Sequence, residues 1–431
     1  MTVDDAELIE RVPRSLRAVN GIPEPEQAAA RERAAALASD ALADLLFTNG
    51  VRTSPLGAGW SRDIDLHVLA WPEPPRLEAL GWLPLDSLMR RLGIPSRGSW
   101  AVMQDGRVLA GLDLHLDAPP SPVTSLITRC RRRGEVRARE VLEARVLLRA
   151  GHPLPPSDPV VSIAARVEAG LGGRDLARWK DGPAVEAPFP LPGNRIRRRL
   201  ASLRSALSPR LVVAVSGVDG SGKSTLSRLV AQNLKQAGIP VSRIWARPGG
   251  KKNRLLDGLA HAGKRLLGQD PSWGAARVAR GGPTGDLASR RGLLGWTWAM
   301  LVTLSFLLDV RQQHLRSRGV ILYDRHLLDA LVQLDFVYGG VDLRLHQAVV
   351  RRGLPKPRLS LYLDVPEEVA LARLARKPQE PDDIYTGQYV VRRQLERYEA
   401  RRPEVGHLRR LDGGRPAEEL AVTVTRWLAE S

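Results

Sequence analysis

The 431-residue sequence has a single cysteine, Cys130, so it cannot build a disulfide framework or a zinc site made of cysteines. A chain without such bonds suits a reducing compartment, and we expect a cytoplasmic protein. The first residues, MTVDDAELIERVPR, also lack the apolar run that a secretory signal requires.

Lysine is scarce in the first part of the chain, where the first one is Lys180. The net charge of +18 comes mainly from arginine, and no nucleic-acid-binding motif or set of interleaved aromatic residues accompanies the basic runs. This pattern disfavours nucleic acid as the main partner without excluding it. It favours phosphorylated small molecules, because guanidinium groups bind phosphate well.

One hydrophobic run, residues 292–308 with the sequence GLLGWTWAMLVTLSFLL, approaches the length of a membrane span. It is slightly too short to cross a bilayer and continues directly into Asp309 and Arg311. We therefore predict a buried core helix and no insertion into a membrane.

The first 150 residues mix helical and strand patterns. Apolar spacing predicts a helix over residues 25–50 that ends at Asn49-Gly50, and alternation predicts strands over 63–71 and 107–117 with a short helix between them. Residues 122–150 carry leucine and valine at helical intervals, which predicts a helix with its arginines toward solvent.

Prolines then interrupt the chain repeatedly between residues 151 and 193, so this stretch is expected to be a connector. We divide the sequence into a domain over 1–150, a connector rich in proline and arginine over 151–204, and a second domain over 205–431. No internal repeat is apparent.

The second domain alternates strand and helix patterns. Strands are predicted over 210–217, 239–247, 319–325, 359–365 and 407–413, with helical stretches between them. Such alternation predicts an α/β fold in which helices flank both faces of a parallel sheet.

A phosphate-binding loop follows the first of these strands. Its residues match the pattern G-x-x-x-x-G-K-[ST] and are Gly217, Val218, Asp219, Gly220, Ser221, Gly222, Lys223, Ser224 and Thr225. Glycines let the backbone N–H groups point at phosphates, at the positive end of the following helix. We expect ATP here, with Lys223 on the β/γ-phosphates and Ser224 on Mg²⁺.

The form GVDGSGKST resembles the loop of the thymidylate kinase family, in which an Asp stands at the position of Asp219. The resemblance covers about residues 205–431 and includes Tyr323-Asp324-Arg325-His326, which is similar to the family's Asp-Arg-Tyr motif. It implies that Asp219 contacts the acceptor or its metal, that Asp324 supports the metal, and that Arg325 binds the acceptor phosphate. It also implies that Arg311 contacts the base and that Arg247 lies in an acceptor loop.

Several positions depart from the family pattern. Arg247 replaces a Glu, Asp329 replaces a Ser, and Leu334 stands where the family has an amide that recognises thymine. A pocket without that amide loses its hydrogen bonds to the base. The departures predict that thymidylate is a poor substrate and that the acceptor is another phosphorylated or nucleotide-like small molecule.

The loop also lacks an arginine, because its variable position is Ser221. The cation that stabilises the transferring phosphoryl group must then come from elsewhere. Basic residues flank the expected lid, and we take Arg376 as the catalytic candidate. The full set is Arg373, Arg376, Lys377, Arg392 and Arg393.

The first domain contains paired carboxylates. Asp63 and Asp65 lie two residues apart on one predicted strand, and Asp113 lies on the other. Such a trio can hold two Mg²⁺ ions for nucleotidyl transfer. Residues 25–125 resemble the nucleotidyltransferase superfamily, which implies an α+β fold, although only Gly57-Ala58-Gly59 is available for its Gly-Ser turn.

The sequence supports an ATP-dependent phosphotransferase that acts on a phosphorylated small molecule. A regulatory switch that binds nucleotide and a nucleic-acid-modifying enzyme remain alternative functions. The sequence is also compatible with a homodimer. Acceptor-dependent ATP turnover separates the enzyme from the switch, and a steep salt dependence of RNA or DNA binding would indicate the third.

Overall fold

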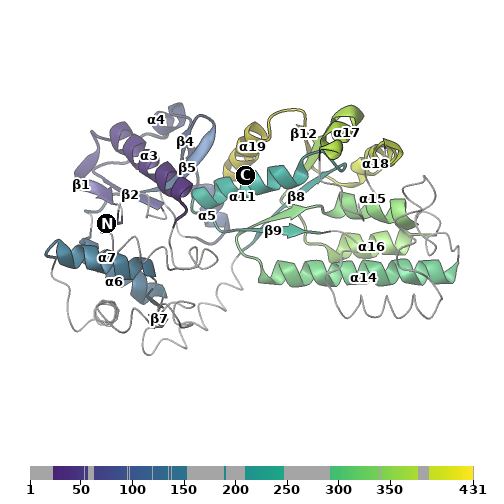
Figure 1. The fold of residues 1–431 in the computed structure, drawn as a ribbon, viewed down its shortest axis with the longest axis horizontal. Helices are drawn as coiled ribbons and strands as arrows, with labels where there is room; N and C mark the ends of the chain where they lie inside the picture. The colour runs from purple at the N-terminus through teal and green to yellow at the C-terminus, as the bar shows by residue number, and fades with distance from the viewer. Residues whose placement is uncertain are drawn as a thin grey trace. The chain divides into compact units, whose positions relative to one another are not determined.

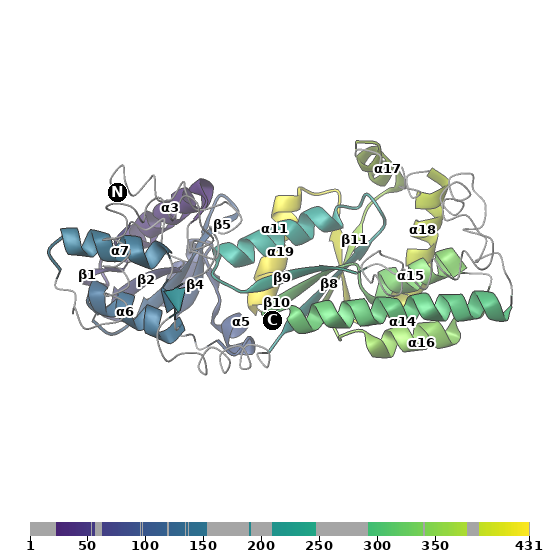
Figure 2. The same ribbon diagram turned by 60° about the horizontal axis from the view of Figure 1, so that its bottom comes forward.

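The computed structural model describes residues 23–52, 54–56, 63–94, 96, 98–118, 120–133, 135–136, 138–152, 189–190, 209–246, 292–338, 341–376 and 388–430. They form two compact units, one built mainly from residues 23–152 and the other mainly from residues 209–427. Each unit has its own five-stranded sheet (Figures 1 and 2).

The first unit contains a mixed sheet with the strand order β1-β2-β5-β4-β3, in which only β2 and β5 pair in parallel. A further small pair joins β6 to β7. Its strands are β1 (Leu46–Arg52), β2 (Asp63–Val68), β3 (Leu83–Pro84), β4 (Ser99–Gln104), β5 (Arg107–His115), β6 (Glu135–Val136) and β7 (Phe189–Pro190). Its helices are α3 (Pro25–Ala41), α4 (Pro74–Ala79), α5 (Asp86–Arg91), α6 (Pro122–Arg133) and α7 (Ala138–Arg149).

Two helix predictions in this unit were wrong in extent. The segment expected to finish a helix at Asn49-Gly50 instead forms β1, and the helix α3 ends at Ala41. A Cβ atom at Gly50 would lie 2.5 Å from the carbonyl oxygen of His67, so glycine permits a close approach to β2 at an irregular point of the strand pair. The helix predicted over 122–150 is divided into α6 and α7 by β6.

The second unit contains a fully parallel sheet with the strand order β12-β11-β8-β10-β9. Its strands are β8 (Leu211–Gly217), β9 (Val241–Trp245), β10 (Val320–Asp324), β11 (Leu359–Asp364) and β12 (Leu408–Asp412). Its helices are α11 (Lys223–Gln236), α14 (Leu293–Arg316), α15 (Leu327–Tyr338), α16 (Arg344–Gly353), α17 (Glu367–Ala375), α18 (Gln388–Arg401), the 3₁₀ helix η3 (Arg402–Glu404) and α19 (Ala417–Glu430).

The helices of this unit flank the sheet on both faces, as predicted (Figures 1 and 2). Helices α11 and α19 cover one face and α14 covers the other, and α16 packs beside α14 and α15. The central strand β8 is buried throughout, because helices cover both of its faces. The parallel order places the carboxyl ends of β8 and β10 side by side.

Helix α14 carries the hydrophobic run of the sequence. Ala299, Phe306 and Val310 are buried in a core cluster with residues of β10 and α15, whereas Leu304 and Leu308 are exposed. The helix therefore has one core-facing side and one exposed apolar side. Among the described residues, no helix combines the length and the apolar character needed to cross a membrane.

Candidate active site

The phosphate-binding loop connects the end of β8 to the start of α11 at Lys223, in the context predicted from the sequence. Its backbone needs glycine at Gly220, where φ is +85°. A Cβ atom there would also lie 2.5 Å from the carbonyl oxygen of Ala370, on α17. The loop is therefore held closely against the helix that follows β11.

Lys223 is buried and its ammonium group folds back onto the loop. Its Nζ atom donates hydrogen bonds to the carbonyl oxygens of Gly217 and Val218, at 2.7 and 2.8 Å, and lies 3.7 Å from Oδ1 of Asp219. Burial, followed by the charge of Arg325, lowers the pKa of Lys223. The ammonium group is thus held by carbonyl oxygens of the loop and lies near the carboxylate of Asp219.

Strand β10 delivers Asp324 and Arg325 to the same place, because Asp324 pairs in register with Val215 of β8. Arg325 adopts a φ of +79°, which is unusual for a residue other than glycine and is often found at functional sites. Its guanidinium group donates a hydrogen bond to Asp219 in a buried ion pair. Burial alone would lower the pKa of Arg325, but the charges of Asp219, Tyr398 and Asp329 and the hydrogen bond to Asp219 together outweigh burial, so this pKa is raised.

Asp324 has the character of a metal ligand. It is buried, and its Oδ1 atom has no hydrogen-bond donor among the described residues. Ser224 presents an exposed hydroxyl in the first turn of α11. Carboxylate and hydroxyl oxygens suit Mg²⁺, so these two residues fit the metal expected with a nucleoside triphosphate.

Two residues of α18 that the sequence did not indicate complete the surroundings of the loop. The side-chain carbonyl of Gln394 accepts a hydrogen bond from the backbone N–H of Asp219, at 3.3 Å. One turn later, the hydroxyl of Tyr398 donates to Asp329 at 2.7 Å. No sequence pattern links position 398 to position 329, because the contact depends on how α15 and α18 pack.

Asp329 has a different role from the one suggested by the sequence. It is buried, and besides Tyr398 it accepts a hydrogen bond from the backbone N–H of His326. Its charge also acts on Lys223 and Arg325. The carboxylate is therefore part of an internal hydrogen-bond network next to Arg325, and the expectation from the sequence that its charge disfavours a second acidic group on the ligand stays a prediction.

Leu334 is fully buried in the core cluster formed by β10, α14 and α15. The same cluster contains Phe306 and Tyr338. Leu334 is thus a core residue, and the expectation that a base-recognising group is missing at this position stays a prediction.

The remaining basic candidates are not all placed together. Arg376 is exposed at the end of α17, and Arg311 is exposed on α14, where its charge acts on His314 together with that of Arg210. Arg373 contacts the loop directly, because its guanidinium donates to the carbonyl oxygens of Ser221 and Gly413, at 3.2 and 2.8 Å. Arg247 and Lys377 lie outside the described residues.

The carboxylates of the first unit lie on its central strand pair. Asp65 of β2 and Asp113 of β5 are direct partners in the parallel register, so their side chains project from the same face of the sheet. Asp63 lies on the same strand, but its side chain is outside the described part of the structure. Within the described residues, no group of three His, Cys, Asp or Glu side chains is arranged to hold a metal ion.

Neighbouring polar groups engage both carboxylates. Ser99 of β4 donates a hydrogen bond to Asp113, and burial raises the pKa of Asp113. Nε2 of His115 lies 3.2 Å from Asp65, and this hydrogen bond raises the pKa of His115. The ring of His67 stacks on that of His115 with centroids 4.9 Å apart. The cluster is polar and preorganised on one face of the sheet.

Comparison with known proteins places the chain among nucleotide kinases, although no protein-family model matches it. A candidate thymidylate kinase of Aeropyrum pernix is 30% identical over 168 residues, which cover 38% of this chain and 67% of that protein. The thymidylate kinase of Roseiflexus castenholzii is 27% identical over 211 residues, 47% of this chain and 78% of that protein.

Among solved structures, a deoxyadenosine kinase from M. mycoides with bound dCMP and dCDP superimposes with a TM-score of 0.33 and 15% identity, over 51% of this chain and 99% of that one. The sequence similarity to the Aeropyrum pernix protein carries the assignment, and it agrees with the phosphate-binding loop and the parallel sheet. The chain belongs to the thymidylate kinase family.

Proposed function

We propose that the chain transfers the γ-phosphate of ATP to a phosphorylated or nucleotide-like small molecule. The observation that carries the proposal is the ion pair between Arg325 and Asp219, directly beside Lys223. Two cations and the phosphate-binding loop meet at the carboxyl edge of β8 and β10, where open α/β sheets bind their ligands. Two phosphate groups can thus be held next to each other.

Both cations are occupied by internal partners that a ligand can replace. The phosphates of ATP would take Lys223 from the carbonyl oxygens of the loop, and the acceptor phosphate would take Arg325 from Asp219. Each exchange substitutes one anionic or dipolar partner for another, so no cation is left buried without a partner. Catalysis then consists of positioning and charge neutralisation.

Magnesium would be held by Ser224 and Asp324, where it would neutralise charge on the transferring phosphoryl group. We assign Asp219 to the acceptor after it leaves Arg325, with Arg247 and Arg311 as further acceptor-binding residues. Arg376 is proposed as the cation that completes the site. Arg373 is a second candidate, because it already contacts the loop at Ser221.

We further propose that residues 1–150 form a nucleotidyltransferase-like domain, joined by a connector over 151–204 to the kinase domain over 205–431. The direct register of Asp65 with Asp113 supports a shared metal site with Asp63. Nucleotide transfer by this unit would be a reaction separate from the kinase reaction.

The test is the release of ADP by the full-length chain with Mg-ATP and a panel of acceptors, including thymidylate, other nucleoside monophosphates and sugar phosphates. We expect turnover that depends on one class of phosphorylated acceptor and is lost in the Lys223→Ala variant. Tight ATP binding without acceptor-dependent turnover would instead indicate a regulatory switch. Binding to RNA or DNA that weakens steeply with salt would indicate the nucleic-acid-modifying alternative.

A further inference from the structure

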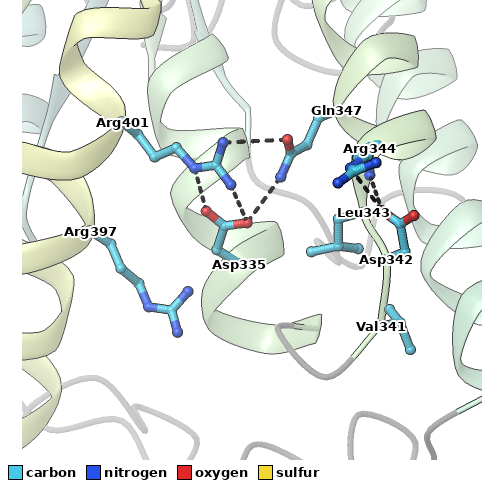
Figure 3. A pocket seen from close by; sticks show the side chains of 8 residues that line it. All are labelled: Asp335, Val341, Asp342, Leu343, Arg344, Gln347, Arg397 and Arg401. Atoms are coloured by element: carbon cyan, nitrogen blue, oxygen red, sulfur yellow. Dashed lines mark hydrogen bonds and ion pairs between the residues drawn. The ribbon is translucent and has the colours of Figure 1, made fainter.

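A cavity lies in the kinase unit, between the last turn of α15, residues 341–347 and helix α18 (Figure 3). Its volume is about 550 Å³, which is in the range of sites for small molecules. None of the phosphate-handling residues Lys223, Asp324 and Arg325 lines it. The cavity is therefore distinct from the candidate active site.

On one side of the cavity, the polar side chains already have hydrogen-bond partners within the protein. Asp335 accepts two hydrogen bonds from Arg401, at 2.6 and 2.9 Å, and a third from the amide of Gln347 at 3.0 Å. Arg401 also bonds Glu404 at 2.8 Å. The bidentate pair of Arg401 with Asp335 joins α18 to α15 and forms a fixed wall of the cavity (Figure 3).

Arg397, on the same helix as Arg401, is not satisfied in this way. It is half-buried, and its one recorded contact within the described residues is the ring of Phe336, 5.9 Å from the guanidinium carbon. Burial lowers the pKa of Arg397, the charge of Asp335 partly opposes this shift, and the charges of Arg393 and Arg401 on the adjacent turns add to it. A partly desolvated cation without an acceptor is costly, so the position favours an anionic ligand.

The opposite wall supplies a second cation. Arg344 begins α16 and is 94% exposed, and its nearest carboxylate, Asp342, is 4.0 Å away. Asp342 also accepts a hydrogen bond from the backbone N–H of Arg344, at 3.0 Å, at the start of α16. In Figure 3, Arg344 and Arg397 come from opposite sides of the cavity.

We propose that this cavity binds a second phosphorylated small molecule, with its phosphate on Arg397 and its polar body toward Asp342 and Gln347. A phosphate accepts hydrogen bonds in several directions and can serve guanidinium groups from opposite walls, whereas a carboxylate accepts in one plane. The carboxylate of Asp335 acts on Arg397 through its charge, but both of its oxygens are hydrogen-bonded to Arg401. The proposal is independent of the kinase reaction.

The test uses the full-length chain with glycerol phosphate as the probe, in the presence of a saturating non-hydrolysable ATP analogue with Mg²⁺. Binding is measured by calorimetry, and its position by amide hydrogen exchange. We expect new protection in peptides that cover 341–350 and 395–402. Arg397→Gln should weaken this binding about tenfold or more, because a charge-assisted hydrogen bond is lost.

Arg352→Gln is the matched control, because Arg352 is an exposed arginine of α16 that does not line the cavity. Arg397→Lys keeps the charge without the planar fork and should give an intermediate affinity. Unchanged affinity in Arg397→Gln, protection confined to the phosphate-binding loop, or equal binding of acetate would each overturn the proposal. If the ATP analogue gave no protection at the phosphate-binding loop of the unmodified chain, that result would count against the kinase assignment and not against this cavity.

Discussion

The hydroxyl of Tyr398 donates a 2.7 Å hydrogen bond to the carboxylate of Asp329, and both side chains are buried. This bond joins α18 to α15 directly behind Arg325, whose pKa is affected by both residues. The helix that carries Tyr398 also carries Gln394, which holds the backbone of Asp219. The position of the phosphate-handling residues therefore depends on the packing of these two helices.

Tyr398→Phe should lower the free energy of unfolding by about 1–3 kcal/mol, because a buried carboxylate oxygen loses its donor. Urea denaturation provides the measurement. Tyr362→Phe is a matched control in the same cluster, since the hydroxyl of Tyr362 is buried without a partner among the described residues. That control should be neutral or stabilising, and an equal loss in both variants would contradict the assigned bond.

Lys223→Ala should leave the fold intact and reduce turnover by more than about tenfold, because the cation at the developing charge is removed. Lys235→Ala, at the exposed end of the same helix, should retain full activity. Turnover is measured as acceptor-dependent ADP release. A Lys223→Ala enzyme with activity close to that of the control would show that the loop is not catalytic.

Arg325→Lys tests whether a planar fork binds the acceptor phosphate. Lysine keeps the charge and, as another side chain with a Cβ atom, has the same conflict with the φ of +79°. We expect KM for the acceptor to rise by about tenfold or more, with little change in KM for ATP. Arg318→Lys, at an exposed position before β10, is the control. A selective rise in KM for ATP would reverse the assignment.

Leu334→Gln tests whether this position belongs to the core or recognises the base of the acceptor. Placing an amide in the core cluster should lower the free energy of unfolding by about 1–3 kcal/mol, because the polar group is buried without a partner. Leu345→Gln, at a side chain that is 51% exposed, should have little effect. If Leu334→Gln were stable and improved the specificity constant for thymidylate, the position would recognise the base after all.

Glu404 predicts a pH dependence of stability. Burial alone would raise its pKa, but hydrogen bonds from Arg351 and Arg401 outweigh burial and lower the pKa below its ordinary value. A lowered carboxyl pKa stabilises the fold above the ordinary value near 4.5, and this contribution is lost as the pH falls through the folded pKa.

Glu404→Gln should therefore reduce the free energy of unfolding at pH 7, by less than about 1 kcal/mol because the pair is partly exposed. The difference from the unmodified chain should disappear as the pH falls below the lowered pKa of Glu404. Glu418→Gln, at an exposed position of α19, serves as the control. A difference that persisted at low pH would mean that packing, and not the charge of Glu404, is responsible.

The sequence by itself determined the phosphate-binding loop and the succession of strands and helices along the chain around it. These features are local: a buried strand, a glycine-rich turn and a helix that begins at Lys223 follow one another within a few residues. The alternation of strands and helices likewise predicted the parallel sheet. The strand of Asp65 and that of Asp113 were both identified from their alternation.

The tertiary structure decided which residues these helices and strands bring into contact. The bond between Tyr398 and Asp329 spans 69 residues, and the register of Asp65 with Asp113 spans 48. Leu334 is an apolar residue in a helical pattern whether it lines a pocket or lies in the core, so the sequence does not distinguish these two positions. The segment around Gly50 contains a turn-like Asn-Gly pair, and its pairing with β2 makes it a strand. Local propensity fixes the elements, whereas the burial of apolar faces selects which residues come together.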